Sequence, residues 1–315
     1  MEGKEKRKID EIMEQLEKGV ASIYDSEGYK RYLDTMSKFH SYSVNNCILI
    51  AMQRPDATYV AGYTAWKAVF HRHVLKDEKG ITIIAPIPSK KKVDVKVVDE
   101  HGSQVLDAAG HPLTEQKEVT YQRFKTATVF DVSQTEGEPL PSLVSELMDP
   151  VQDYEEYFSA IKELSPVPVR FDNIPSGAKG YFSPSKQEIV LQRGMPEEQT
   201  IKTLLHECAH ARLGHGGDDD HSDRRTHEVQ AESVAYCCCK AIGLDTSEYS
   251  FGYIAGWSSG KDQKELKASL QTIRDQADQM IKGTEEKISR VMELRAEKAT
   301  IEAPKVHTEG LKIAM

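Results

Sequence analysis

Two histidines one helical turn apart bracket a glutamate in the second half of the chain. The segment reads His206-Glu207-Cys208-Ala209-His210, and positions i and i+4 of a helix lie on one face. Both imidazoles can therefore bind a single Zn²⁺ ion, and Glu207 beside them can act as a general base toward a water molecule that the ion activates. Apolar residues recur at helical spacing around the motif, which predicts a helix from Pro196 to about Gly214 with a buried face.

A second predicted helix, over about residues 226–242, offers the third metal ligand. Glu228 and Glu232 are again four residues apart and share a face. One carboxylate can bind the metal while the other accepts a hydrogen bond from a ligand histidine. We favour Glu228 as the ligand and Glu232 as the hydrogen-bonding partner, and the spacing leaves the reverse assignment open.

Three further histidines lie nearby and are not assigned as ligands. His215 is out of register for the extended three-histidine motif, since Leu213 stands where that motif requires glycine. His221 lies in an acidic loop. His227, or Tyr236 on the same predicted helix, could instead stabilise an oxyanion during hydrolysis.

Composition limits the classes of protein that this chain can belong to. Its 315 residues are enough for about two domains, and 39% hydrophobic with 29% charged residues indicates ordinary buried cores. No apolar run reaches the length of a transmembrane helix, and the first residues do not form a secretory signal, so we expect a cytoplasmic protein without a membrane partner. The net charge of −9 argues against a protein that coats nucleic acid throughout.

The pattern of elements predicts an α+β protein with two domains. We expect a helix-plus-antiparallel-sheet domain over residues 1–132, a linker over 133–150, a zincin-like domain over 151–285, and a C-terminal helical extension and tail over 286–315. Predicted helices cover about residues 9–24, 42–54, 63–72, 154–164 and 261–299, the last interrupted at Gly283, and predicted strands cover 81–84, 93–98, 119–132, 167–171 and 188–191.

Several stretches resemble the ArdC-type antirestriction proteins, whose metallopeptidase domain is related to the ImmA/IrrE zinc peptidases. In the second half these are Gly180–Pro184, Ile189–Leu191, Thr203–His210, Ala231-Glu232 and Tyr253–Trp257. In the first half they are Ser43–Asn46 with Ile48, Tyr63–Lys67, His73–Lys76, Glu78–Ile81 and Val129–Val132. The resemblance covers about residues 5–280, and the chain departs from it at 86–120, which is longer than the family's typical loop.

The resemblance implies a single-stranded-DNA-binding N-terminal domain in a protein of a conjugative plasmid or transposon. Such a protein would accompany or protect incoming single-stranded DNA. Single-strand binders combine basic groups with aromatic faces on which bases stack. The candidates of these types are Tyr63, Trp66, Lys67, Arg72, Lys76 and Lys79. A place in the core remains the alternative for Trp66.

The leading hypothesis is a zinc-dependent peptidase of the gluzincin type joined to a single-stranded-DNA-binding domain. Zn²⁺ would be held by His206, His210 and Glu228, and the substrate would be an unidentified peptide or protein. The extended segment 187–192, just before the motif helix, could add a substrate strand at its edge. Two alternatives stay open: a non-enzymatic single-stranded-DNA-binding protector with structural zinc, and a regulatory protease that cleaves a repressor.

Overall fold

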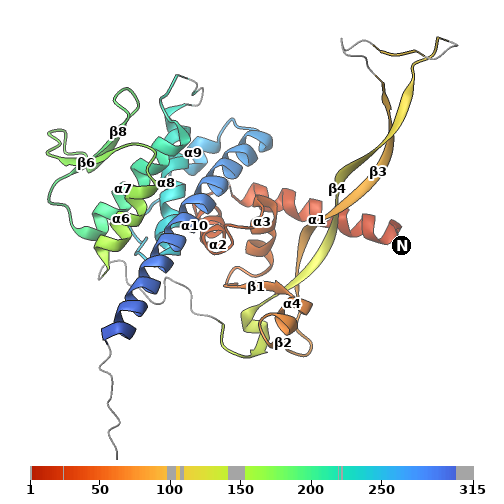
Figure 1. Ribbon diagram of the computed structural model, residues 1–315, viewed down its shortest axis with the longest axis horizontal. Helices are drawn as coiled ribbons and strands as arrows, with labels where there is room; N and C mark the ends of the chain where they lie inside the picture. The colour runs from red at the N-terminus through yellow and green to blue at the C-terminus, as the bar shows by residue number, and fades with distance from the viewer. Residues whose placement is uncertain are drawn as a thin grey trace, which may run out of the picture. The chain divides into compact units, whose positions relative to one another are not determined.

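A computed structural model describes residues 2–23, 25–97, 104–106, 110–140, 153–218, 220 and 223–302, with the side chains of 2–9 and 296–302 left out. The architecture is α+β, as predicted, with a long C-terminal helix (Figure 1). By internal packing the chain divides into two compact units. The first unit comprises residues 1–19 and 52–138, and the second comprises 20–51 and 139–315. The predicted domain limits at 132, 150 and 285 remain predictions.

A three-stranded antiparallel sheet forms the centre of the first unit. Its order is β1 (Val60–Gly62), β4 (Thr114–Asp131) and β3 (Ile81–Lys96). The unit also contains most of α1 (Glu2–Ser22), with α4 (Tyr63–Ala68), β2 (Arg72–Val74), the 3₁₀ turn η1 (Val132–Gln134) and β5 (Thr135–Gly137), which pairs with β2. Much of the predicted linker, residues 141–152, lies outside the described residues, whereas its start forms part of η1 and β5.

β3 and β4 continue as a two-stranded ribbon far beyond β1, which pairs only with residues 129–131 (Figure 1). We predicted two short strands at 81–84 and 93–98, but β3 runs unbroken for 16 residues. Pro86 and Pro88 are tolerated because β3 is an edge strand, and residues two apart can both direct their nitrogens away from β4. We call this ribbon, residues 85–96 with 114–125, the arm.

The second unit is a set of helices beside a small mixed sheet (Figure 1). Its sheet has the order β6 (Val169–Asp172), β8 (Glu188–Gln192), β7 (Gly180–Ser183), with β6 parallel and β7 antiparallel to β8. Its helices are α2 (Ser26–Lys38), α3 (Val44–Gln53, whose last two residues belong to the first unit), α6 (Tyr154–Leu164), α7 (Glu197–Leu213), α8 (Arg224–Ala241), α9 (Ile254–Ser258) and α10 (Gln263–Glu302). α8 is central, because it packs against α7, α10, α2 and α9.

The predicted interruption of the last helix is wrong, since α10 passes through Gly283 without a break. Glycine is used there for packing. A Cβ at Gly283 would lie 2.7 Å from Leu164 Cδ2, so the missing side chain lets α10 approach the end of α6. α10 also holds the turn between α2 and α3.

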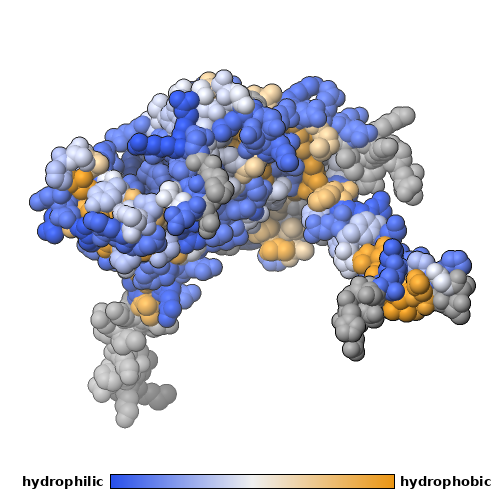
Figure 2. Space-filling model, turned by 90° about the horizontal axis from the view of Figure 1, so that it is seen from above, coloured by the Kyte–Doolittle hydropathy of each residue, from blue (hydrophilic) through white to orange (hydrophobic). Residues whose placement is uncertain are grey.

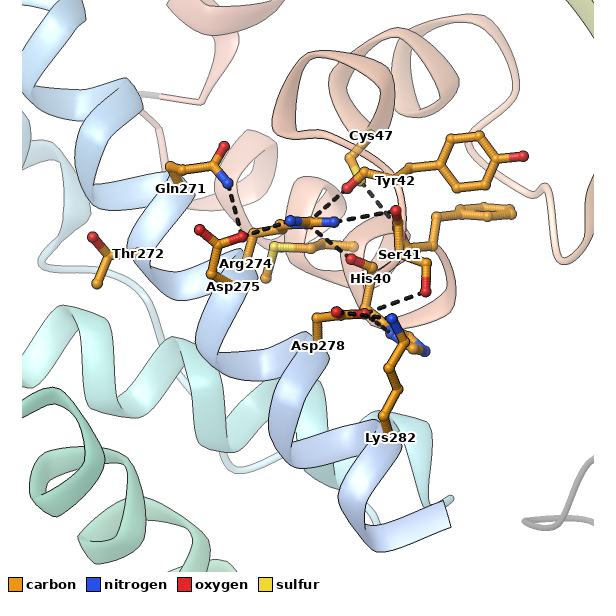
Figure 3. Close-up of polar contacts among 12 residues, drawn as sticks. His40, Ser41, Tyr42, Cys47, Gln271, Thr272, Arg274, Asp275, Asp278 and Lys282 are labelled. Carbon is orange, nitrogen blue, oxygen red and sulfur yellow. Dashed lines mark hydrogen bonds and ion pairs between the residues drawn. The ribbon is translucent and has the colours of Figure 1, made fainter. Parts of the chain in front are cut away.

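Arg274 and Asp278 of α10 bind that turn directly (Figure 3). The Arg274 guanidinium donates to the carbonyl oxygens of residues 40–42 at 2.9–3.1 Å. Asp278 accepts hydrogen bonds from the His40 ring at 2.7 Å and from Lys282 at 2.9 Å. The carbonyl groups of this turn thereby gain donors, and residues 40–42 are joined to α10 within the second unit.

Apolar residues are gathered inside the units. The face drawn in Figure 2 is mostly hydrophilic, with apolar residues in separate patches. Among the described residues, no helix combines the length and the apolarity that a membrane crossing requires.

Candidate metal centre and nucleic-acid-binding residues

Helix α7 carries the His-Glu-x-x-His motif and begins and ends at clear signals. Glu197 and Glu198 lie in its first turn, where negative charge is favourable, and Gly214 ends it in the left-handed conformation, with φ of 69°. The helix buries Leu204, Leu205 and Cys208 and leaves His206 and His210 only partly covered. The motif residues therefore lie at a rim between core and solvent.

Three side chains converge as a metal site would require. His206 Nε2 and His210 Nε2 lie 3.1 Å apart, and Glu228 Oε2 lies 3.6 and 3.7 Å from them. Ligands about 2.05 Å from a tetrahedral zinc ion are separated by about 3.3 Å, so this triangle has the right size. The two imidazoles, which face the Glu228 carboxylate, lower its pKa well below the ordinary value. The donor set, two imidazoles and one carboxylate, suits zinc.

Glu207, beside His206 in the motif, is more enclosed than the two histidines. It is 8% exposed, and burial raises its pKa above the ordinary value for glutamate. The backbone N–H of Phe182, in β7, donates to its carboxylate. A carboxylate with a raised pKa that is held in place by a backbone donor suits a general base.

His215 contacts a ligand of the metal triangle, a neighbour that our sequence analysis did not predict. Its Nδ1 is 2.9 Å from His210 Nδ1, and its Nε2 is 3.0 Å from Gln230 Oε1. Burial lowers the pKa of His215 to about 4. Its ring stacks on that of His227 at 4.5 Å, and His227 pairs with Asp220 at 2.7 Å. The turn at Gly214 was the signal that could have predicted this contact, because it folds the chain back along α7.

Glu232 lies one turn beyond Glu228 and does not join the triangle. It accepts a hydrogen bond from the hydroxyl of Tyr253, and burial raises its pKa. No hydrogen bond from a histidine to Glu232 occurs among the described residues. The assignment of Glu228 as the ligand remains a prediction, and the geometry favours it over Glu232.

Two hollows adjoin at the motif and together form a cleft. One, of about 450 Å³, is lined by Lys179, Lys202, Glu232, Glu248 and Tyr249. The other, of about 430 Å³, is lined by His210, His215, Arg224, His227 and Glu228. Gly180, His206 and Glu207 belong to both.

Some expectations about this cleft are wrong. β8 cannot supply an edge for a substrate, because it is the middle strand, with β6 and β7 on either side. Tyr236 is buried and donates to Asp34, away from the cleft, so it does not face a reacting group. His227 does line the cleft, and His221 lies outside the described residues.

β7 is the strand whose outer edge faces the motif. Lys179 O accepts from Gln192 N, so alternation along the strand turns the backbone groups of Gly180 and Phe182 away from β8. The bond from Phe182 N–H to Glu207 agrees with that orientation. Gly180 allows the close approach, since a Cβ there would lie 2.7 Å from Thr203 Cγ2.

The proposed nucleic-acid-binding residues of the first unit fall into two groups. Trp66 is fully buried, and its indole N–H donates to Phe130 O at 2.9 Å, so its faces cannot stack on bases. The Arg72 guanidinium is occupied by Thr135 and by carbonyl groups of the β5 region. The other candidates are exposed, and they are Tyr63 (61% exposed), Lys67, Lys76 and Lys79.

Two family models match the chain. The N-terminal domain of anti-restriction factor ArdC matches residues 4–130, and the IrrE N-terminal-like domain, of the Peptidase M78 family, matches residues 165–239. The second match contains α7 and almost all of α8, with His206, Glu207, His210 and Glu228.

The individual proteins that resemble this chain share less than 30% sequence identity with it. An uncharacterised protein of Bacillus anthracis is 27% identical over 92% of this chain, which spans about half (53%) of that protein's length. Two crystal structures of antirestriction protein ArdC from the R388 plasmid are similar. The metal-free structure has a TM-score of 0.46 at 20% identity, covering 79% of this chain and 86% of that one. The Mn(II)-bound structure has a TM-score of 0.49 at 18% identity, covering 88% and 97%.

The order of the two matched domains, and the placement of the motif helix within the second, define the type of protein. An ArdC N-terminal domain precedes an IrrE-like domain that holds a His-Glu-x-x-His helix. The chain is therefore an ArdC-type protein in its domain composition, with an ArdC N-terminal domain followed by an IrrE-like domain of the Peptidase M78 family.

Proposed function

We propose that the second unit is a zinc-dependent peptidase and that the first unit binds single-stranded DNA. The observation that carries the first part is the triangle of His206, His210 and Glu228 with Glu207 beside it. When bound there, a zinc ion would polarise the scissile carbonyl and acidify a water molecule. By analogy with the family, the protein would work in the cytoplasm on behalf of a mobile genetic element.

The residues of the chain would share the remaining tasks. Glu207 would take the proton at its carboxylate and return it to the leaving amine. The N–H of Phe182 keeps that carboxylate turned toward the cleft. The outer edge of β7, at the backbone groups of Gly180, would pair with the substrate backbone, in place of the β8 edge that the sequence suggested. His227, on the far wall, remains a candidate for oxyanion stabilisation.

Metal analysis tests the site before any substrate is known. We expect purified wild type and Glu232→Ala to bind one equivalent of zinc, and Glu228→Ala to lose most of it. Inductively coupled plasma mass spectrometry after dialysis against limiting zinc measures the content. Equal loss in both variants, or loss only in Glu232→Ala, would contradict the assignment of the third ligand.

Glu207→Gln then separates a peptidase from a protein with structural zinc. This variant should keep its zinc and lose at least about 100-fold in the cleavage of fluorescently labelled casein, since it has no general base. Glu248→Gln, in the same cleft, is the matched control and should stay within about threefold of wild type. Zinc-loaded wild type without activity, or Glu207→Gln with full activity, would support the non-enzymatic alternative.

The DNA-binding part rests on exposed residues near the base of β4. The Tyr63 ring contacts the Phe130 ring edge to face. The side chains of Lys67, Lys76 and Lys79 are exposed. We expect a Lys67→Gln, Lys76→Gln, Lys79→Gln variant to bind a labelled 30-nucleotide single strand at least about tenfold more weakly at 50 mM salt. Fluorescence anisotropy measures the loss, and undiminished binding would sink this half of the proposal.

A further inference from the structure

The arm carries more positive charge on one of its faces than on the other. In an antiparallel pair, directly opposed residues lie on the same face, so the register assigns every side chain. One face holds Lys91, Lys117, Arg123 and Lys125 against Glu115, four basic groups to one acidic, so +3. The other holds Lys90, Lys92 and Lys96 against Asp94 and Glu118, three to two, so +1. We call the first the cationic face.

The charges of the cationic face are available to a ligand. All four basic side chains are exposed. Within the described part of the chain, no ion pair or side-chain hydrogen bond involves them. On the opposite face, by contrast, Lys90 is paired with Glu118 at 2.7 Å. Tyr121, 42% exposed, lies on the cationic face between the positions of Lys91 and Arg123.

These charges form a line along the arm. Opposed positions place Lys125 beside Ala85, Arg123 beside Ile87, and Lys117 beside Val93. Eight residues of strand separate the first from the last, which is about 26 Å at about 3.3 Å per residue. A line of this length matches the spaced phosphates of a linear polyanion, and the vesicle experiment below tests the alternative of an anionic membrane surface.

From this arrangement we infer that the cationic face of the arm binds duplex nucleic acid. A two-stranded ribbon is narrow enough to enter the major groove of a double helix. Single-strand binders instead use a groove lined with several stacking rings, and the cationic face has one exposed ring, that of Tyr121. This surface is separate from the single-strand residues proposed above, and the inference does not depend on them or on the peptidase.

Two triple variants with matched charge changes test the inference in the full-length protein. Lys91→Gln, Lys117→Gln, Arg123→Gln changes the cationic face, and Lys90→Gln, Lys92→Gln, Lys96→Gln changes the opposite face. The probe is a labelled 30-base-pair DNA duplex, with one of its strands alone as the comparison. Fluorescence anisotropy between 50 and 300 mM NaCl gives the affinity and its salt dependence, and circular dichroism checks the fold.

We expect the cationic-face variant to bind the duplex at least about tenfold more weakly. The slope of the logarithm of the binding constant against the logarithm of the salt concentration should be smaller by about 2–3, because each lost phosphate contact removes about 0.9 from it. The opposite-face variant should stay within about threefold of wild type. Equal losses in the two variants, no loss in either, or a loss seen only with the single strand would overturn the inference. So would intact duplex binding together with lost sedimentation on phosphatidylserine vesicles.

Discussion

The protonation of His210 follows from the groups around it. Gln230 Nε2 donates to Ser269 Oγ at 3.0 Å, so its Oε1 faces His215 Nε2 as an acceptor. His215 must then carry its proton on Nε2 and accept at Nδ1, which requires His210 to donate from Nδ1. The Nε2 of His210 is left with its lone pair toward the metal triangle. The orientation of one amide is thus transmitted to the ligand nitrogen through His215.

His215→Ala should therefore weaken zinc binding by about 10–100-fold, since the ligand loses the partner that fixes its tautomer. His215→Asn should recover part of the loss, because its amide oxygen can accept from His210. His227→Asn, which keeps the contact between His215 and His210, is the control. Competition with a chromophoric chelator measures the affinity, and an alanine variant that binds zinc as tightly as wild type would refute the role.

Asp131 provides the clearest pH-dependent contribution to stability. Burial alone would raise its pKa, but donors from Ser133, Thr58 and Tyr59 outweigh burial and lower it. A carboxyl whose pKa is lowered in the folded state stabilises the fold when it is ionised. Its contribution is complete at pH values above its ordinary pKa of 3.8, and it is lost as the pH falls through the lower pKa of the folded state.

Asp131→Asn should accordingly lower the free energy of unfolding by about 3 kcal/mol at pH 7, because an amide N–H₂ would face backbone donors. The difference from wild type should shrink as the pH falls below 3.8, where the wild-type carboxyl is itself protonated. Urea titrations in a Trp257→Phe background, followed by the fluorescence of the neighbouring Trp66, give both values. A difference that is constant with pH would mean that the charge is not involved.

At the scale of elements, β7 can lie close to α7 because Gly180 has no side chain. A Cβ at Gly180 would lie 2.7 Å from Thr203 Cγ2 and 3.1 Å from Val190 O, and the latter is backbone that cannot move aside. Gly180→Ala should therefore lower the free energy of unfolding by about 1–3 kcal/mol. Gly252→Ala, in the same unit with ordinary contact distances, should change it by less than about 1 kcal/mol. Chemical denaturation compares the two, and equal effects would show that the approach of β7 to α7 is not tight.

The helices around the motif could be predicted because pattern and capping agree there. The predicted helix 154–164 has the observed bounds, and the motif helix differs from α7 only at its ends. α2 was missed although Tyr29, Tyr32, Leu33 and Met36 recur at helical spacing after the capping residue Asp25. β7 is absent from the predicted strands, and its four residues include a glycine and a serine, which are typical of turns. Its strand conformation depends on pairing with β8, a contact that local sequence does not encode.

The arm shows the other limit of sequence-based prediction. Turn-forming residues and prolines between 81 and 113 suggested several short strands, because each signal was interpreted locally. In the fold, the register with β4 extends through both prolines and fixes the two faces. Which lysines share a face depends on that register, so the cationic face could not be derived from the run Lys90–Lys92 alone.

At the scale of the whole molecule, the two compact units each contain one of the chain's two tryptophans. Trp66 is buried in the first unit, where it donates to Phe130 O. Trp257 is buried in the second, where its indole donates to Thr226 Oγ1, at the start of α8, at 3.0 Å. A fluorescence signal can therefore be assigned to one unit after the other tryptophan is replaced.

Zinc should stabilise the unit that binds it, because a ligand that binds only the folded state adds RT ln(1 + [L]/Kd), about 2.7 kcal/mol at one hundred times Kd. In Trp66→Phe, where Trp257 reports, urea titrations should show the free energy of unfolding raised by that amount when zinc is present. In Trp257→Phe, where Trp66 reports, the increase in the free energy of unfolding on adding zinc should be smaller, because the metal triangle lies in the other unit. Each variant is compared with itself, with and without zinc. Adding Glu228→Ala to Trp66→Phe should abolish the increase. Equal increases at both tryptophans would show that the units unfold together, and an increase that survives Glu228→Ala would place the ion elsewhere.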